Sequence, residues 1–227
     1  MTSPLAAGVA VALVTLLAVV GPLLGVSPAL IALTVALALA AITLDAALLS
    51  GRGGHLLAEA LPGGQQRLRR VAVHEAGHVL AAAEAGLPVH RVLVGSLACL
   101  RAGLAAGGST ELEPPAHARL PLEQLRRWSR VLQAGMVAET QVFGASIGGA
   151  DDRALLGRLW GLSGHDVATA RREQRQARRE VEALLRRRRA DLDSEVEKLL
   201  ADAPRLGRRA APAIGPTPAI GPTPQEG

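Results

Sequence analysis

The sequence is poor in the residues that cross-link or reinforce small domains. Its 227 residues include one cysteine, one phenylalanine, two tryptophans and no tyrosine. A single cysteine excludes a disulfide within the chain, and Cys99 is predicted to fill a core position rather than to act as a nucleophile. With so few aromatic side chains, the core must be built from alanine, leucine and valine, which favours closely packed helices.

Lysine is almost absent as well, since Lys198 is the only one. The chain therefore has no nucleotide-binding loop of the G-x-x-x-x-G-K-[ST] type. The formal charge of +5 comes almost entirely from arginine. This positive charge suits a domain near anionic lipid headgroups. The basic residues are too weakly patterned along the chain to predict a nucleic-acid partner. A solvated helix face is the favoured interpretation of the four arginines at 186–189, and a contact with lipid headgroups is the other.

Charged residues are nearly missing from the first 50 positions, where Asp45 is the exception. The apolar runs there predict a transmembrane hairpin of two helices, at about 5–24 and 27–48. Gly21-Pro22 and Ser27-Pro28 mark the turn between them. A signal peptide is the alternative, but no basic residue precedes the first run and a second apolar run follows at once.

The arginines that flank these runs predict an orientation. Arg52, Arg67, Arg69 and Arg70 follow the second run, and no basic residue precedes the first. The positive-inside rule then leaves the rest of the chain on the cytoplasmic side. We expect an integral protein of the plasma membrane, or of the thylakoid if the source is a photosynthetic organism.

The remainder divides into a linker at 51–66, a mainly α-helical soluble domain at 67–203 and a Pro/Gly tail at 204–227. A small β element is expected at 89–94, with a second short strand near 97–104. The tail repeats Ala-Ile-Gly-Pro-Thr-Pro and is predicted to be disordered. Helices are expected at 67–85, 122–143 and 153–162, with one bent helix or two over 165–203.

A metal-binding motif, H-E-x-x-H, lies on the first of these helices, where residues 74–78 are His-Glu-Ala-Gly-His. Residues four apart lie about 40° apart around an α-helix. The imidazoles of His74 and His78 therefore point the same way and can hold one Zn²⁺. Glu75 lies beside them, where it can take a proton from a metal-bound water that attacks a peptide carbonyl. The pattern predicts a zinc hydrolase with Glu75 as the general base.

Such a site needs a third protein ligand. An H-E-x-x-H-x-x-G-x-x-H pattern is excluded, because Ala81 and Glu84 occupy the positions that its glycine and histidine would need. Glu111 and Glu113 are weaker candidates for the third ligand, because they lie in a Pro-rich segment with no predicted helix to hold their side chains toward the histidines.

Asp152 is a better candidate for the third ligand. It follows a glycine turn at a predicted helix start, where the helix dipole favours a carboxylate. The neighbouring Asp151 has nearly the same claim. A helix cap explains either aspartate as well as a metal ligand does.

These segments together resemble the peptidase domain of the FtsH family of membrane-anchored zinc proteases. The likeness begins with VAVHEAGH at 71–78, continues through G-x-x-A-E-x-x-V-F-G at 135–144 and GGADD at 148–152, and covers residues 68 to 203. It implies a mainly helical zinc-peptidase domain in which an aspartate after the glycine turn completes the metal site. Asp152 matches that aspartate best. Asp151 is the alternative third ligand, depending on which of Gly148 and Gly149 is the family's turn glycine.

The chain differs from that family in lacking an ATPase module between membrane and peptidase, where it has only the linker at 51–66. Its hairpin also lacks the sizeable loop usual in the family. We therefore predict a membrane-anchored zinc metalloendopeptidase that cleaves unfolded or flexible segments without an ATPase of its own. The expected partners are protein or peptide substrates, the lipid bilayer, and further copies of the chain or FtsH-type ATPase proteases.

Two other functions are weighed against this one. A non-hydrolytic zinc-binding membrane scaffold, or a modulator of FtsH-type protease complexes, is the alternative. An intramembrane protease is disfavoured because Arg67, Arg69, Arg70 and Glu84 flank or lie within the motif helix. For the peptidase, the strand at 89–94 is expected to pair with the substrate backbone.

Overall fold

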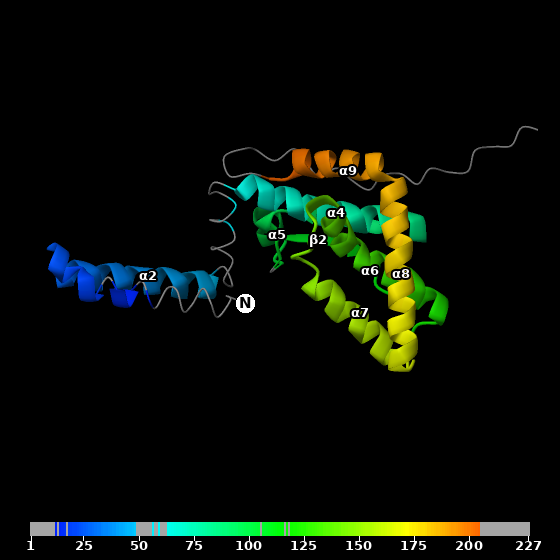
Figure 1. Cartoon of the computed structure of the whole chain (residues 1–227), viewed down its shortest axis with the longest axis horizontal. Coiled ribbons are helices and arrows are strands. Elements are labelled where there is room, and N and C mark those ends of the chain that lie inside the picture. The colour runs from blue at the N-terminus through cyan, green and yellow to red at the C-terminus, as the bar shows by residue number, and fades with distance from the viewer. Residues whose placement is uncertain are drawn as a thin grey trace, which may run out of the picture. The chain divides into compact units, whose positions relative to one another are not determined.

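The structure is a computed structural model of the chain, mainly helical with one small sheet (Figure 1). It describes residues 12, 14–16, 18–48, 56, 59, 63–104, 106–115, 117 and 119–204. The chain divides into two compact units, Met1–Gly54 and His55–Gly227. The predicted disordered tail at 204–227 lies outside the described residues except for Pro204, as does most of the predicted linker at 51–66.

The first unit contains one long apolar helix, α2 (Pro28–Leu48). Its segment Pro28–Ala47 is long and apolar enough to span a membrane. The described residues between 12 and 20 are helical, and the short 3-10 helix η1 (Pro22–Leu24) separates them from α2. The predicted two-helix hairpin is not shown: the helix expected at 5–24 falls partly on residues that are not described. Its last residues form η1 because Pro22 has no backbone N–H to continue an α-helix.

The second unit is built around two long helices that pack against each other, α4 (Gly64–Ala85) and α6 (Leu122–Phe143). Gly77 allows their close approach. A Cβ at this position would lie 2.7 Å from the carbonyl oxygen of Ala134 and 2.8 Å from the Cβ of Ala138. These two helices correspond to the helices expected at 67–85 and 122–143.

Beside α4 lies a two-stranded antiparallel sheet of β1 (Val89–Val94) and β2 (Gly108–Leu112). Strand β1 is where the sequence predicts it, but the prediction of a second strand near 97–104 is wrong. That segment forms most of helix α5 (Ser96–Arg101), which contains none of the β-branched residues that favour strands. The Glu59 carboxylate fixes the start of α5, because it accepts hydrogen bonds from the Ser96 N–H and hydroxyl at 2.8 and 2.7 Å.

Three further helices complete the unit: α7 (Ala150–Leu162), α8 (Val167–Arg187) and α9 (Arg189–Asp202). The segment expected to form one bent helix or two thus forms two, separated at Arg188. Helix α8 packs on α6, and α9 packs on α4 (Figure 1).

The main core lies between these packed helices. Its fully buried residues are all alanine, valine or leucine, as the scarcity of aromatic residues predicts. Trp128 and Trp160 belong to a second cluster between α6 and α7. Cys99 is fully buried in α5, in agreement with a core role. The two clusters hold α4, α6 and the start of α7 in fixed relative positions, and these are the elements that carry the candidate site.

Candidate metal centre

Helix α4 places His74 and His78 on the same side, one helical turn apart, and both side chains are buried. Their ring centroids are 4.8 Å apart and the ring planes meet at 70°. Because residues four apart on a helix share a face, this pairing follows from the motif spacing. The Nε2 atoms of both rings face the start of α7.

Asp152, in the first turn of α7, meets these two imidazoles. Its Oδ2 lies 3.1 Å from His74 Nε2 and 3.4 Å from His78 Nε2. The three side chains form a group whose ligand atoms all lie within 4.8 Å of one another. Asp151 is exposed and is not part of this group. The structure therefore brings together the two histidines and the second of the two candidate aspartates.

The remaining ring nitrogens have their own partners. His74 Nδ1 lies 2.7 Å from Glu139 Oε1, and His78 Nδ1 lies 2.8 Å from the Val131 carbonyl oxygen, with Glu139 and Val131 both on α6. A ring nitrogen that donates to a carboxylate or a backbone carbonyl fixes the tautomer, so that the other nitrogen can bind a metal. Both rings are thus oriented by α6 and have Nε2 available toward Asp152.

Glu139 also connects His74 to the glycine turn that precedes Asp152. Its carboxylate accepts hydrogen bonds from Arg70 Nη1 at 3.1 Å and from the backbone N–H groups of Ile147 and Gly148 at 3.0 and 3.2 Å. The sequence pattern alone gives Glu139 no role at the site. The available signal was its position, because it is a carboxylate on the apolar face of the helix 122–143, where a charge requires partners.

Gly135 on α6 makes room for both imidazoles. A Cβ at this position would lie 2.5 Å from His74 Nε2 and 2.6 Å from His78 Nε2. Real Cβ atoms do not come so close to other heavy atoms, so any side chain here would push both rings away. A glycine inside a helix costs about 1 kcal/mol relative to alanine. Here the absence of a side chain at Gly135 allows the Nε2 atoms of both imidazoles to lie directly against α6.

Glu75 is buried next to the histidines and is held by the sheet. Thr110 on β2 donates a hydrogen bond from its hydroxyl to Glu75 Oε2 at 2.7 Å. Gly108, on the same strand, leaves space for the carboxylate, because a Cβ there would lie 2.5 Å from Glu75 Oε1. Strand β2 therefore positions the candidate general base, although the sequence predicts the second strand too early, near 97–104.

The titrating groups of the site shift one another's pKa values. Burial lowers the pKa of His74, but its hydrogen bonds to Asp152 and Glu139 outweigh this effect and raise the pKa to about 10. Burial raises the pKa of Glu139, while hydrogen bonds from His74, Ile147 and Arg70 lower it to about 2. Asp152 is also buried, which raises its pKa, but its bonds to His74 and His78 hold that pKa below the ordinary range. Burial raises the pKa of Glu75, as suits a general base.

For the metal-free protein, these shifts predict a stability that falls as the pH rises above neutrality. The folded-state pKa of His74 exceeds its ordinary value of 6.5. Its contribution to the free energy of unfolding is therefore complete below about pH 6.5 and is lost as the pH rises through about 10. With a chelator present, the urea midpoint should fall over this range. The chain has no tyrosine, one lysine and one cysteine, so few other side chains ordinarily titrate there.

A His74→Gln variant provides the control for this pH dependence. It lacks the titrating imidazole, so its urea midpoint should change little between about pH 7 and pH 10. A wild-type midpoint that stays constant over the range, or a variant with the same slope as the wild type, would contradict the electrostatic account of His74.

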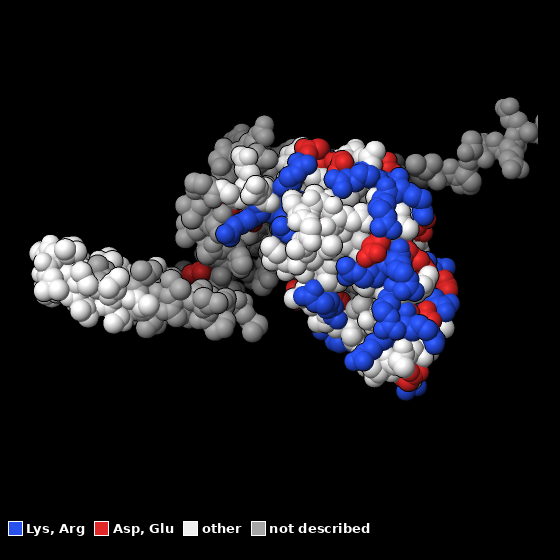
Figure 2. Space-filling model, in the orientation of Figure 1, with Lys and Arg blue, Asp and Glu red and all other residues white. Residues whose placement is uncertain are grey.

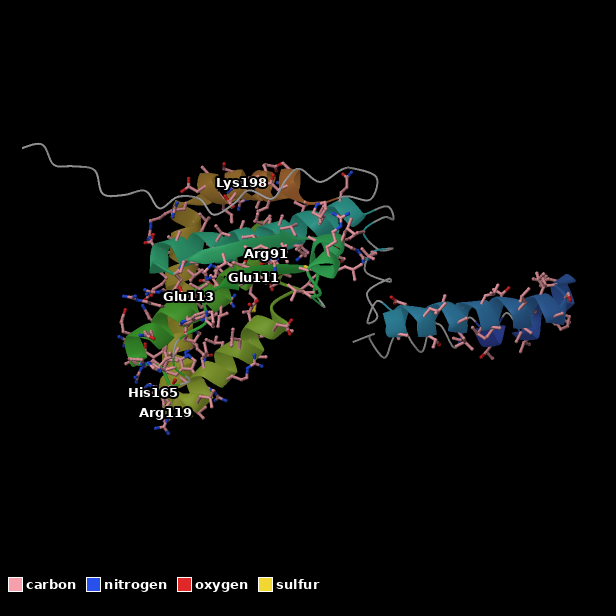
Figure 3. The ribbon with its side chains drawn as sticks, turned by 180° about the vertical axis from the view of Figure 1, so that it is seen from behind. Arg91, Glu111, Glu113, Arg119, His165 and Lys198 are labelled. Carbon is pink, nitrogen blue, oxygen red and sulfur yellow. The ribbon has the colours of Figure 1, made fainter. Side chains whose placement is uncertain are left out.

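The other acidic residues weighed as ligands lie elsewhere. Glu111 forms an ion pair with Arg91 across the sheet, with Arg91 Nη2 at 2.6 Å from its Oε1 (Figure 3). Glu113 follows β2 and is not part of the histidine and aspartate group. His90 and His117 are exposed. The ring of His165 packs on Trp160, with centroids 5.6 Å apart, away from α4 (Figure 3).

The donor set of the site fits a divalent metal ion. One nitrogen from each imidazole and one carboxylate oxygen converge, and each imidazole has its second nitrogen occupied by a partner on α6. A metal ion that binds here would displace the proton that the raised pKa keeps on His74. Zinc is the ion that most often binds such a set, and three protein ligands are typical of catalytic rather than structural zinc sites. No protein-family model and no curated protein matches the chain. The grounds for a function are therefore this geometry and the sequence pattern.

Proposed function

We propose that the protein is a zinc-dependent endopeptidase of the FtsH peptidase type, anchored in a membrane by its apolar N-terminal segment. The observation that carries the proposal is the convergence of His74, His78 and Asp152 beside a buried carboxylate, Glu75. A metal site of three protein ligands with an adjacent general base is the arrangement that zinc peptidases need.

Each side chain has a distinct role in the proposed reaction. His74, His78 and Asp152 hold the ion, which when bound supplies the Lewis acidity that makes water a nucleophile near neutral pH. Glu75 accepts the proton of the attacking water and returns it to the leaving amine. Thr110 occupies Oε2 of Glu75, so Oε1 is the atom that takes the proton. Glu139 and the Val131 carbonyl keep the two imidazoles in place during the reaction.

Strand β2 is the better candidate for contact with a substrate backbone. The sequence alone favours the strand at 89–94, which is β1, for this role. It is β2, however, that contacts Glu75 through Thr110. In the described part of the chain β1 is the only strand that pairs with β2, so the other edge of β2 has no strand partner. An extended peptide added along this edge would pass beside the general base.

The substrates and setting follow from the same features. The sequence has no nucleotide-binding loop, so we expect cleavage of segments that are already unfolded or flexible. Segment Pro28–Ala47 is the proposed anchor, and the arginines after it favour the cytoplasmic side for the peptidase. An FtsH-type ATPase protease or further copies of the chain remain the proposed protein partners.

The test is cleavage of casein, an unfolded protein, by the purified full chain with added zinc. We expect casein fragments in the presence of zinc, none after treatment with a zinc chelator, and recovery when zinc is restored. A stably folded protein should remain intact under the same conditions. Intact casein in the presence of chain that carries one zinc per molecule would contradict the peptidase and support the non-hydrolytic scaffold.

A further inference from the structure

One side of helix α8 carries a row of arginines that the metal centre does not use. The row consists of Arg171, Arg172, Arg175, Arg178, Arg179 and Arg186, which we call the arginine stripe. All six are exposed, and their spacing along the helix puts them on the side opposite the buried one. Basic side chains follow the length of α8 in Figure 2. The buried side consists of Ala170, Glu173, Ala177, Val181, Leu184 and Leu185.

Four of the six arginines in the stripe have no acidic partner among the described residues. In that part of the chain no ion pair is formed by Arg171, Arg175 or Arg186, and Arg179 donates to the neutral side chain of Gln176 at 2.6 Å. Arg178 pairs with Glu182 at 3.0 Å, which is an exposed pair within the helix. By contrast, Glu173 on the buried side of α8 pairs with Arg126 of α6, with Arg126 Nε 2.8 Å from Glu173 Oε2. Several guanidinium groups without an acidic partner thus lie together on the outer side of α8.

The charge balance of this segment is strongly one-sided. Between Val167 and Arg189 the sequence has nine arginines and three glutamates, with no lysine or aspartate. Like charges four residues apart destabilise a helix, as at Arg171 and Arg175. Guanidinium groups, unlike ammonium groups, match phosphate oxygens with two parallel hydrogen bonds. An array of phosphates would relieve the repulsion and satisfy these donors.

We infer that the arginine stripe binds the phosphate groups of anionic lipids at a membrane surface. A helix of 21 residues is about 30 Å long, so the stripe presents a nearly straight basic edge to a plane of headgroups. The chain also has a segment, Pro28–Ala47, that is long and apolar enough to span a bilayer. A chain anchored in this way meets lipid phosphates at a high local concentration, which favours them over a nucleic-acid backbone as the partner of the stripe. This inference does not depend on the metal centre or on peptidase activity.

The experiment measures how close α8 comes to the lipid headgroups. A donor dye is placed on the full chain through Gln176→Cys, an exposed position beside the stripe. The only native cysteine, Cys99, is fully buried, so labelling occurs at the introduced thiol. The labelled chain is reconstituted in nanodiscs with acceptor-labelled headgroups, made of phosphatidylcholine alone or with phosphatidylglycerol. We expect higher energy transfer with phosphatidylglycerol, and loss of the difference at about 1 M salt, where the Debye length is about 3 Å.

A matched pair of triple variants separates the stripe from general charge. Arg171→Gln, Arg175→Gln and Arg186→Gln together should abolish the lipid-dependent difference. The control removes the same charge from Arg101, Arg119 and Arg158, which are also exposed and form no ion pair among the described residues. This control triple should behave like the parent. Glutamine is a good helix former, so circular dichroism should show the same helix content in all forms.

Four outcomes would overturn the inference. The first is equal energy transfer in both lipid compositions, and the second is an equal loss of transfer in the two triple variants. The third is failure of the chain to insert into nanodiscs, because it is the membrane anchor that favours lipid phosphates over a nucleic-acid backbone as the partner of the stripe. The fourth is binding of a single-stranded oligonucleotide to the stripe, with loss of that binding in the stripe variant, but no response to phosphatidylglycerol.

Discussion

Glu75→Gln should abolish peptide hydrolysis while leaving the metal in place. The amide keeps the size of the carboxylate and its hydrogen bond to Thr110, but it cannot accept a proton. General-base catalysis contributes about 10²–10⁴-fold to such reactions, and we expect kcat for casein cleavage to fall by that factor. Glu75 is not among the three ligand side chains, so zinc content should stay at the wild-type value. The measurement is kcat together with zinc per chain on the same preparation.

Glu84→Gln is the matched control for this variant. It makes the same chemical change on the same helix, at an exposed position with no ion pair among the described residues. Its kcat should equal that of the wild type. If Glu75→Gln cleaves casein at the wild-type rate, the role assigned to Glu75 is wrong. If it loses zinc, the variant acts through the metal site rather than through proton transfer.

Gly135→Ala should remove the metal by displacing both imidazoles. The new methyl group would lie 2.5 Å from His74 Nε2 and 2.6 Å from His78 Nε2, so neither ring can keep its position. Losing one supporting hydrogen bond costs a metal site about 10–100-fold in affinity. Displacing two ligands should cost more, and hydrolysis should be lost with the metal. Zinc affinity, measured by competition with a chromophoric chelator, is the direct readout.

Gly157→Ala controls for the effect of alanine on helix stability. Gly157 lies within α7, and nothing lies within 4 Å of a Cβ added there. This variant should bind zinc like the wild type and should be more stable, by up to about 1 kcal/mol. Wild-type zinc affinity in Gly135→Ala would contradict the close packing of the imidazoles on α6. Equal loss of affinity in both variants would point to a general effect of alanine instead.

The helices and the paired histidines could be predicted because their signals are local. Hydrophobic periodicity with glycines at the ends marked 67–85 and 122–143, which correspond to α4 and α6. The four-residue spacing of His74 and His78 fixes their relation on a helix whatever packs around it. The core of alanine, valine and leucine followed directly from composition.

The supporting parts of the site depend on contacts between distant segments, and the sequence alone does not predict them. Glu139 lies 65 residues from the His74 that it orients, and Thr110 lies 35 residues from the Glu75 that it holds. The Glu59 carboxylate that fixes the start of α5 comes from a segment that was read as linker. Such pairings have no periodic signal, and so β2 was placed too early in the sequence.

The choice between Asp151 and Asp152 also required the structure. Adjacent residues point about 100° apart around a helix, so only one of the two can face the histidines. Both follow the same glycine turn, and local rules of helix capping do not distinguish them. The start of α7 at Ala150, after Gly149 at a φ of 83°, sets the rotation that turns Asp152 toward α4.

The zinc content of the purified full chain and of its Asp151→Ala and Asp152→Ala variants is the most direct test of the proposed centre. The account predicts about one zinc per chain for the wild type and for Asp151→Ala, and little or none for Asp152→Ala. Full zinc content in Asp152→Ala, or loss of zinc in Asp151→Ala alone, would contradict the assignment of the third ligand and the peptidase mechanism built on it.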